Sequence, residues 1–489
     1  MNRGRQLKKN TLLTGIRDTL AVDAAKAVEA GSRLTGHQGT SITGKAAMAL
    51  APTVLADLAG QVRKATFAVC GTNGKTTTNN ILCAMLEAGG NKVVCNRLGA
   101  NMLNGITGAY VSMSGLGGKL DADYACLEID EASAARVFPH VHPEYLILTN
   151  LFRDQLDRYG EIDITIDLLK NAIQMVPDMK LIINADDPLS VYLAMKTGNP
   201  FVCYGIADTS RILPERQTSH EIREGQFCKK CGAPLQYDYY QYGQMGKYHC
   251  SACDFRRPEP QYAAVGITTE NGVNFLVEGL PVKSDLRGSY SVYNLLAVWG
   301  ALREEKNRIL FSGKHANMAE PVSGPGNRRT GTEQPDTKLF NEVLRTYHTQ
   351  FGRNEMFFID GRSVVLNLAK NPAGFNQNIE AMLEDREAKR LVIVINDNDQ
   401  DGTDVSWLWD VDFDRIRDGS IKSVAVSGIR ALDMCLRLKY VEIQADVTET
   451  PEAAIEEQLA KGQEKLYVLV NYTALFSIHR HLQEREKNA

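Results

Sequence analysis

The chain of 489 residues has no apolar run that approaches the roughly 20 residues needed to span a bilayer. Its basic start, MNRGRQLKKN, is not followed by an apolar core with a small-residue cleavage site, so we expect no secretory signal. The sequence also has no internal repeat and no low-complexity tract. These absences predict a cytoplasmic protein that is not an integral membrane protein.

An excess of charge of one sign is missing as well. The formal net charge is −4, with 23% charged and 44% hydrophobic residues, which is ordinary for a soluble globular protein. This balance gives no general attraction to nucleic acid or to an anionic membrane. A chain of this length is expected to form two or three domains.

Six of the ten cysteines are scattered through apolar segments, and none of them stands in a Gly-x-Cys-x-Gly elbow. These six are Cys70, Cys83, Cys95, Cys126, Cys203 and Cys435. In a large chain without a secretory signal, scattered cysteines are expected to be buried thiols rather than disulfides. None of these six cysteines is therefore a candidate nucleophile.

Short β-branched runs alternate with helical stretches, which predicts an α/β fold with mostly parallel sheets covered by helices on both faces. We expect an N-terminal helical segment (1–50), a first α/β domain (51–311), a linker or loop (312–345) and a second α/β domain (346–489). A polar, cysteine-bearing insertion interrupts the first domain at about 222–258. The expected strands are TFAVC, KVVC, YACLEI, YLILTN, KLIIN and YAAVGI, then SVVLNL, RLVIVIN, SVAVSG and KLYVLVN.

The stretch ATFAVCGTNGKTTTNNILCAMLEAGG, residues 65–90, has the order of strand, glycine-rich loop and helix that binds phosphate. It is shorter than the usual phosphate loop, because Val69 stands where that loop has glycine. We expect the backbone N–H groups of residues 72–76 to converge on phosphates, Lys75 to reach the β and γ phosphates, and the Thr76 hydroxyl to bind Mg²⁺. The alternative is a tight turn with a surface lysine. The candidate nucleotide-binding residues here are Gly71, Thr72, Asn73, Gly74, Lys75, Thr76 and Thr77.

Carboxylates follow the expected strand YACLEI, where open α/β sheets bind ligands. Glu128 is our candidate for a magnesium contact, direct or through water, and Asp130 and Glu131 lie beside it. The alternative is an acidic cluster at the start of a helix.

A second polar group follows the expected strand YLILTN, in the stretch TNLFRDQLDRYGE. Asn150, Asp154 and Asp157 could hold a second metal ion or orient a substrate. A solvated helix start is equally compatible with this pattern.

Cys228, Cys231, Cys250 and Cys253 have the spacing C-x2-C-x18-C-x2-C. Two such knuckles on a short β-ribbon present four thiolates in a tetrahedron, which suits Zn²⁺. Because protein atoms fill all four positions, we expect the metal to be structural and not catalytic. Disulfides or free thiols are the alternatives.

The stretch RLVIVINDNDQDGTDVSWLWDVDF, residues 390–413, crowds carboxylates and two tryptophans after an apolar strand. Such carboxylates are costly unless metal, amines or solvent compensate, and a solvated acidic loop is the plain alternative. The two tryptophans, Trp407 and Trp409, suggest that this region packs against another surface, either of this chain or of a second one. Lys370 and Asn371 follow another expected strand.

The motifs GTNGKTT, TNLFRDQLDRYGE, NADDP and GSYSVYNLLA, with the Glu-bearing strand, resemble the ATP-dependent Mur ligase superfamily in order and spacing. The resemblance implies that ATP converts a carboxylate into an acyl phosphate, which an amine then attacks. It also implies that Asn294 contacts adenine. Gln155 stands where the superfamily has a histidine, and Ser291 stands where it has the first asparagine of its adenine motif.

With the four-cysteine insertion, NLAKNPAGFN and NDNDQDGTDVSWLWD, residues 45–475 resemble the MurT family, the Mur ligase-like subunits of lipid II isoglutaminyl synthases. This resemblance implies a heterodimer with the glutaminase subunit GatD. The heterodimer amidates the α-carboxylate of D-glutamate in the lipid II stem peptide, at the inner face of the membrane. Asp404 would be catalytic, as the aspartate that completes the partner's Cys-His triad.

The predicted function is therefore an ATP-dependent amidoligase that uses ATP, Mg²⁺ and Zn²⁺. One alternative is a stand-alone ligase of the Mur or folylpolyglutamate type that adds an amino acid without a partner. The other is a zinc-ribbon ATPase that binds nucleic acid, for which CDFRRPEP offers a few basic residues. The acidic balance and the lack of a long basic stripe argue against nucleic acid.

Overall fold

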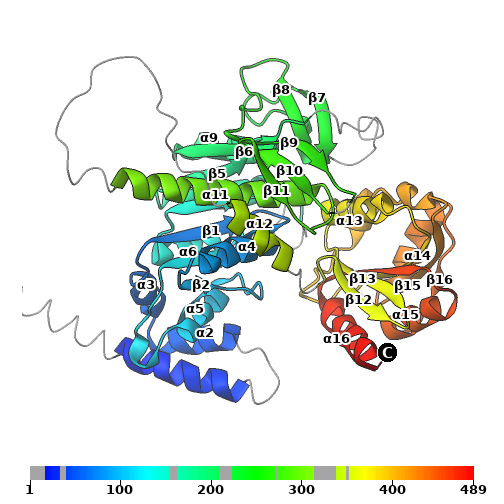
Figure 1. Ribbon diagram of the computed structural model, residues 1–489, viewed down its shortest axis with the longest axis horizontal. Helices are drawn as coiled ribbons and strands as arrows, with labels where there is room; N and C mark the ends of the chain where they lie inside the picture. The colour runs from blue at the N-terminus through cyan, green and yellow to red at the C-terminus, as the bar shows by residue number, and fades with distance from the viewer. Residues whose placement is uncertain are drawn as a thin grey trace, which may run out of the picture.

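The computed structural model describes residues 17–32, 40–154, 162–208, 223–270, 272–312, 337–347 and 352–488. Two α/β units make up most of this chain, and Figure 1 shows the second unit, coloured yellow to red, beside the first. None of the described helices has the length and apolar character to cross a membrane. The predicted α/β class is confirmed.

The first unit is built on nine strands. They are β1 (Ala65–Cys70), β2 (Val93–Cys95), β3 (Tyr124–Glu128), β4 (Tyr145–Leu148), β5 (Lys180–Asn184), β6 (Phe201–Ile206), β9 (Tyr262–Thr268), β10 (Asn274–Val277) and β11 (Leu280–Lys283). They form one sheet in the order β11-β10-β9-β6-β5-β4-β1-β3-β2. Neighbouring strands from β2 to β9 are parallel, whereas β10 and β11 pair antiparallel at one edge.

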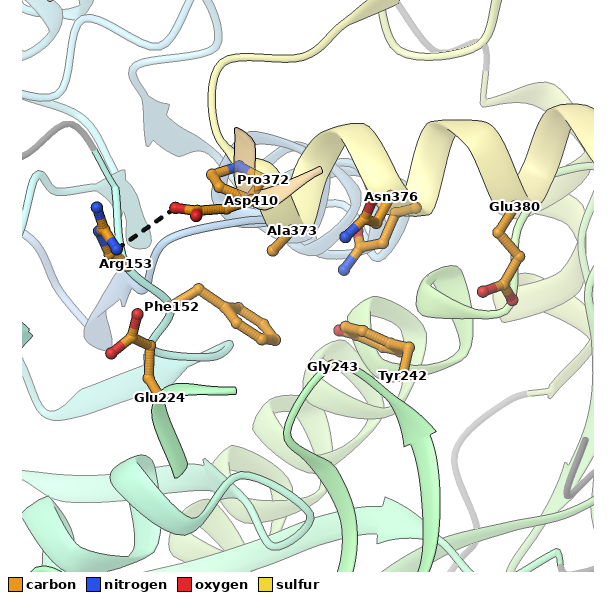
Figure 2. A pocket seen from close by; sticks show the side chains of 11 residues that line it. Phe152, Arg153, Glu224, Tyr242, Gly243, Pro372, Ala373, Asn376, Glu380 and Asp410 are labelled. Carbon is orange, nitrogen blue, oxygen red and sulfur yellow. Dashed lines mark ion pairs between the residues drawn. The ribbon is translucent and has the colours of Figure 1, made fainter. Parts of the chain in front are cut away.

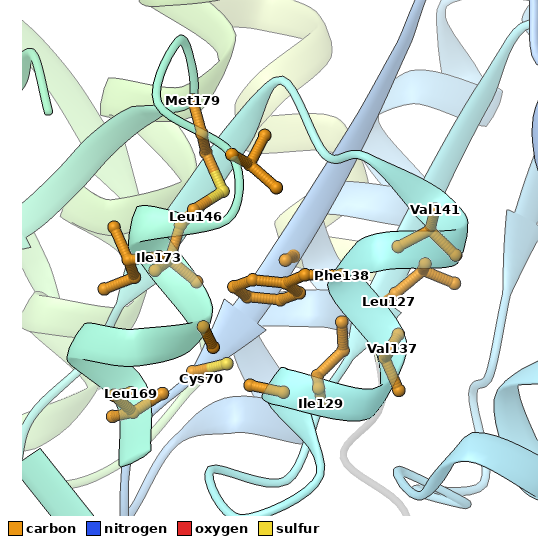
Figure 3. Packing of buried hydrophobic residues seen from close by; sticks show 14 of the residues in the cluster. Cys70, Leu127, Ile129, Val137, Phe138, Val141, Leu146, Leu169, Ile173 and Met179 are labelled. Atoms are coloured by element: carbon orange, nitrogen blue, oxygen red, sulfur yellow. The ribbon is translucent and has the colours of Figure 1, made fainter. Parts of the chain in front are cut away.

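Helices cover both faces of this sheet. They are residues 17–32, α2 (Thr40–Leu50), α3 (Val54–Ala59), α4 (Lys75–Ala88), α5 (Leu103–Met113), α6 (Ala134–Val141), α8 (Ile162–Gln174), α9 (Pro188–Thr197), α11 (Tyr290–Ser312) and α12 (Thr337–Thr346), with a 3-10 turn η1 (Leu116–Gly118). Successive strand residues point to opposite faces, so Phe67 packs with α4 and α11 while Ala68 packs on the side of α6 and α8. Figure 3 shows the second layer, in which Phe138 of α6 lies near Leu146 and Ile173.

A small antiparallel hairpin stands between β6 and β9, at the position of the predicted insertion 222–258. It consists of β7 (Leu235–Tyr242) and β8 (Met245–Cys250), and the 3-10 turn η2 (Glu224–Gln226) precedes it.

The second unit is built on six strands and the helices around them. The elements are β12 (Glu355–Ile359), β13 (Arg362–Leu368), α13 (Pro372–Glu384), β14 (Lys389–Val394), η3 (Ser406–Asp410), η4 (Phe413–Arg417), β15 (Ile421–Ser427), α14 (Ala431–Tyr440), β16 (Asp446–Val447), α15 (Pro451–Ala460), β17 (Lys465–Val470) and α16 (Tyr472–Asn488). The strand order is β12-β13-β17-β14-β15-β16, parallel except for β12. One face packs against α13, α14, η3 and η4, and the other against α15 and α16.

Every strand named from the sequence is present, but part of the predicted linker 312–345 is wrong. Its end is helix α12, whose Phe340 is 3% exposed and packs edge-on against Trp299 with ring centroids 5.2 Å apart. The Gly- and Pro-rich residues that suggested a linker fall mostly in 313–336, outside the described residues. The linker prediction was based on the composition of that stretch, and it wrongly included the short amphipathic helix that follows.

Candidate active site

The predicted phosphate loop joins β1 to α4, and glycine is required at two of its positions. Gly71 and Gly74 have φ angles of 123° and 85°, in the left-handed region that residues with a Cβ rarely adopt. A Cβ at Gly71 would lie 2.2 Å from Thr149 Oγ1, and one at Gly74 would lie 2.3 Å from Asn294 Oδ1. Asn294, predicted to contact adenine, therefore lies directly against the start of α4.

Two backbone N–H groups of the loop have protein partners. Thr72 N donates to Asn150 O at 2.8 Å, and Asn73 N donates to Asn150 Oδ1 at 2.9 Å. This differs from the expectation that all N–H groups of residues 72–76 converge on phosphate. The donors best placed for an anion are those of the first turn of α4, because a helix supplies no partners for them.

Lys75 is turned inward, which excludes the surface lysine of the alternative interpretation. Its side chain is 9% exposed, and Nζ donates to Gly71 O at 2.5 Å and to Glu131 Oε1 at 2.9 Å. Burial lowers the pKa of Lys75, but the carboxylates of Glu131, Glu128 and Asp130 more than offset it and raise the pKa above its ordinary value. The loop therefore holds a buried cation where a phosphate would arrive.

A hydroxyl and a carboxylate meet beside this lysine because β1 and β3 are adjacent. The Thr76 hydroxyl donates to Glu128 Oε2, and Asn101 Nδ2 donates to Glu128 Oε1 at 2.9 Å. Hard oxygen ligands of this kind suit Mg²⁺. The residues present therefore fit the predicted magnesium site.

The second unit contributes two side chains to the loop. Arg353 Nη2 donates to Thr76 Oγ1 at 2.8 Å, and Asn371 Nδ2 donates to Asn73 Oδ1 at 3.3 Å. Sequence reasoning missed Arg353, because a single arginine between a helix and a strand carries no local signal. Arg353 is 277 residues away from Thr76 in the sequence, and only the packing of the two units brings their side chains into contact.

Lys370 also reaches the first unit. Its Nζ lies 2.6 Å from Asp154 Oδ2, and the Asp154 side chain is 10% exposed. Burial raises the pKa of the Asp154 carboxyl, but the charge and hydrogen bond of Lys370, the charge of Lys75 and the hydrogen bond from Asn371 together outweigh burial, so the pKa lies below its ordinary value. Asp157, the other carboxylate of this stretch, lies outside the described residues.

A pocket with an empty volume of about 530 Å³, including the part open to solvent, is lined by Phe152 and by residues of the β7–β8 turn and of α13. Figure 2 shows Phe152 and Tyr242 on one side of it and Ala373 and Asn376 of α13 on the other. The two rings are stacked with centroids 6.0 Å apart. Phe152 N donates to Thr72 Oγ1 at 2.9 Å, so the wall of the pocket is bonded to the loop. A planar apolar group could bind here next to a phosphate chain.

The four predicted metal ligands form one cluster. The Sγ atoms of Cys228, Cys231, Cys250 and Cys253 all lie within 4.8 Å of one another. The separations Cys228–Cys253 and Cys231–Cys250 are 3.6 and 3.4 Å, too long for disulfides of about 2.05 Å. They approach the roughly 3.8 Å edge of a tetrahedron with Zn–S bonds of about 2.3 Å. The disulfide alternative is therefore wrong, and the thiolates fit a zinc ion.

The acidic loop before η3 contains two carboxylates with different surroundings. Asp401 is 3% exposed and accepts a hydrogen bond from Thr473 N at 2.8 Å. Asp404 is half-buried, and its Oδ1 accepts from Ser406 N at 2.8 Å. Hydrogen bonds from Ser406 lower the pKa of Asp404, so it is ionised at neutral pH. Asp404 is the carboxylate of the two that a second molecule can approach.

The two tryptophans of this region also differ. Trp407 is 7% exposed and packs on Phe375 in the core, whereas Trp409 is 50% exposed and lies edge-on to Tyr440. Tyr440 follows Leu432 and Leu436 at four-residue spacing on α14, which places all three on one side of the helix, and each is at least 49% exposed. These residues with Trp409 form an exposed apolar surface on the second unit.

Two family models match the chain: the Mur ligase middle domain over residues 69–302 and the MurT ligase C-terminal region over residues 368–475. A protein of Staphylococcus aureus (strain N315), the lipid II isoglutaminyl synthase (glutamine-hydrolyzing) subunit MurT, is 34% identical over 88% of this chain and 90% of its own. The protein of the same name from Streptococcus pneumoniae (strain ATCC BAA-255 / R6) is 30% identical over 92% and 93%. Among solved structures, a pseudomurein peptide ligase type C from Methanothermus fervidus has a TM-score of 0.60 at 20% identity, covering 86% of this chain and 79% of that one. The last likeness supports the fold alone.

Proposed function

The chain belongs to the MurT family of Mur ligase-like proteins, and we propose that it is the synthetase subunit of a lipid II isoglutaminyl synthase. It activates the α-carboxylate of D-glutamate in the lipid II stem peptide and amidates it with ammonia from a partner glutaminase. The observation that carries this proposal is the meeting of Lys75, Glu128 and Arg353, from both units, at one phosphate loop.

Several features support MgATP as the phosphate donor. The first turn of α4 offers N–H donors to phosphate oxygens, and Lys75 adds a cation that is already in place. The pocket beside Phe152 and Tyr242 can take the purine. Asn294, the residue expected to contact adenine, lies against Gly74 of the loop. Thr76 and Glu128 would hold a magnesium ion, which would neutralise charge on the phosphate oxygens.

The chemistry proceeds in two balanced steps. A substrate carboxylate oxygen attacks the γ-phosphorus of ATP, and ADP leaves with the electrons of the broken P–O bond. Ammonia then attacks the carbonyl carbon of the acyl phosphate, inorganic phosphate leaves, and the nitrogen loses a proton. Lys75 and Arg353 place two positive side chains at the loop, where negative charge develops in the first step. Lys370 adds a third positive charge beside Asp154.

The names of the two MurT relatives describe one subunit of a glutamine-hydrolyzing synthase, which supports a separate nitrogen source. In this proposal Asp404 orients the histidine of the glutaminase triad across the subunit interface, as a buried aspartate does within one chain. Trp409, in the turn η3 that begins two residues after Asp404, belongs to the exposed apolar surface of Trp409, Leu432, Leu436 and Tyr440. This surface suits contact with such a partner.

The four-cysteine cluster holds zinc with a structural role in this proposal. All four ligand positions are thiolates of the chain, so no position remains for a reacting water. Zinc here supplies folding energy to the hairpin.

Amidation of lipid II by the chain together with the glutaminase that co-purifies with it is the direct test. We expect product that requires both ATP and either glutamine or a high concentration of ammonium. A stand-alone amino-acid ligase would instead attach an amino acid and ignore ammonium. Failure to form amide from either nitrogen source, with ADP released only on addition of an amino acid, would overturn the proposal.

A further inference from the structure

The turn of the β7–β8 hairpin lies at the end opposite the four cysteines. Leu235 pairs with Cys250 of the four-cysteine cluster, whereas Tyr242 pairs with Met245 beside the turn. Strands of this length separate the two ends by about 23 Å. A hairpin turn is ordinarily solvent-exposed, but Gln244 at this turn is fully buried.

The amide of Gln244 is saturated with hydrogen bonds at this buried position. Its Nε2 donates to Leu151 O at 2.7 Å and to Asp187 Oδ1 at 2.8 Å. Its Oε1 accepts from Gly225 N at 3.0 Å. Asp187 Oδ2 also accepts from Leu151 N at 2.8 Å, so Gln244 and Asp187 together hold both backbone polar groups of Leu151.

Leu151 is one residue away from the nucleotide pocket. The next residue, Phe152, lines that pocket, donates from its N to Thr72 Oγ1, and accepts from the same hydroxyl at its O, both at 2.9 Å. The preceding residue, Asn150, accepts from the backbone N–H groups of Thr72 and Asn73. Residues 150–152 are therefore tied to the phosphate loop on one side and to the hairpin turn on the other.

The hairpin also shapes the pocket directly. Tyr242 and Gly243 line it, and a Cβ at Gly243 would lie 3.0 Å from Phe152 Cε1. The turn end of the hairpin is also bonded to Asp186, because Gly246 N donates to Asp186 O at 3.0 Å. Arg257, which follows the hairpin, donates from Nε to Asp186 Oδ1 at 2.6 Å. The hairpin thus runs from the cysteine cluster to the pocket wall.

We propose that the hairpin is a brace for the nucleoside triphosphate site, and that Gln244 is its positioning residue. Gln244 holds residues 150–152 so that Phe152 faces the base and Thr72 keeps the loop in its binding conformation. This inference deepens the proposed function and rests on its MgATP site. It assigns the hairpin a role in nucleotide affinity in addition to stability.

The test uses calorimetry to measure the binding of MgADP to the full chain with zinc bound at the four cysteines. Gln244→Met keeps the length of the side chain and removes its hydrogen bonds. We expect the Kd for MgADP to rise about tenfold. Gln241→Met is the matched control, because Gln241 lies on the same hairpin, is 4% exposed, and contacts Asp208 O at 3.4 Å rather than the loop segment. The Kd of Gln241→Met for MgADP should stay within about twofold of the parent value. This should hold even where its thermal midpoint falls as much as that of Gln244→Met.

Two further variants keep the test decisive. Gln244→Asn retains the amide, but its side chain is one methylene too short to reach Leu151 O. It should therefore also raise the Kd for MgADP. This variant replaces Gln244→Met in the test if Gln244→Met does not fold. Lys75→Met reports on the nucleotide site itself. Weaker binding in Lys75→Met with normal binding in both Gln244 variants would overturn the brace. Normal binding in Lys75→Met would instead contradict the proposed MgATP site.

Discussion

Lys75 Nζ lies 2.9 Å from Glu131 Oε1, and the two side chains are only 9% and 6% exposed. A buried ion pair adds little net stability, but removal of one partner leaves the other charge buried and uncompensated. Glu131 also accepts from Gly71 N at 2.7 Å, so the pair fixes the shape of the loop as well as its charge. Lys75 therefore has a structural role besides any contact with phosphate.

Replacing Lys75 by methionine should abolish product formation and also destabilise the protein. We expect turnover to fall by at least about 10²-fold, the scale of removing one charge-stabilising group. The free energy of unfolding should fall by about 3–5 kcal/mol, because Glu131 loses its partner. Turnover assays and urea unfolding measure the two effects.

The double variant Lys75→Met/Glu131→Gln separates these effects. It removes both charges, so most of the lost stability should return while turnover stays low. Lys119→Ala, at an exposed lysine, is the control for general charge loss. Near-normal turnover in the double variant would contradict the role of Lys75 at the phosphate.

Metal analysis should find one zinc ion per chain in protein purified without chelator. Cys228→Ser should lose that zinc and lower the thermal midpoint by at least about 5 °C, because a structural zinc contributes folding energy directly. Cys435→Ser, at a cysteine outside the cluster, should keep the zinc. A full complement of zinc in Cys228→Ser would count against the four-thiolate site.

The ion pair of Asp154 with Lys370 predicts a defined pH dependence. The pKa of Asp154 is lowered in the folded protein, so its contribution to stability is present above the unfolded value of about 4 and is lost as the pH falls through the folded value. Asp154→Asn should be less stable than the parent at pH 7, and the gap should close below about pH 4. Urea unfolding between these pH values measures it.

Asp167→Asn is the control for this pH series. Asp167 is 69% exposed and pairs with Lys170 on the same helix, so its loss should change stability little at any pH. An Asp154→Asn gap that stays constant down to pH 3 would contradict the interdomain ion pair.

Local patterns were enough to predict ten of the strands, the phosphate loop and the cysteine cluster, but they missed strands such as β6, β10 and β11. β-Branched runs such as those of β3 and β14 carry their own signal, and the cysteines reveal themselves by spacing. Glu128 was found because it ends such a strand. The same reasoning could not rank Asp401 against Asp404, because burial decides between them.

Contacts between distant segments could not be read from the sequence. Arg353 reaches Thr76 only because the second unit packs beside α4, and the partner of Lys75 follows from the β1–β3 pairing. Gln244 looks like any polar residue of a hairpin turn until the fold buries it against Leu151. In each case the residues come together only in the folded chain, so no local sequence pattern identifies them.

The most direct test of the account uses Asp404→Asn in the complex with the glutaminase. The substitution keeps the shape of the side chain and removes its charge, and an equivalent change within one triad costs about 10⁴ in turnover. Product formation is measured with glutamine and, separately, with high ammonium. Asp401→Asn is tested beside it as the buried neighbour.

We expect the Asp404→Asn complex to assemble, bind ATP and lose amidation with glutamine, while ammonium restores part of the activity. The phosphate loop and Glu128 are unchanged in this variant, so the ATP-dependent step remains. Equal loss with both nitrogen sources would place Asp404 in the ligase site instead. Full activity with glutamine would contradict the claim that this chain completes the partner's catalytic triad.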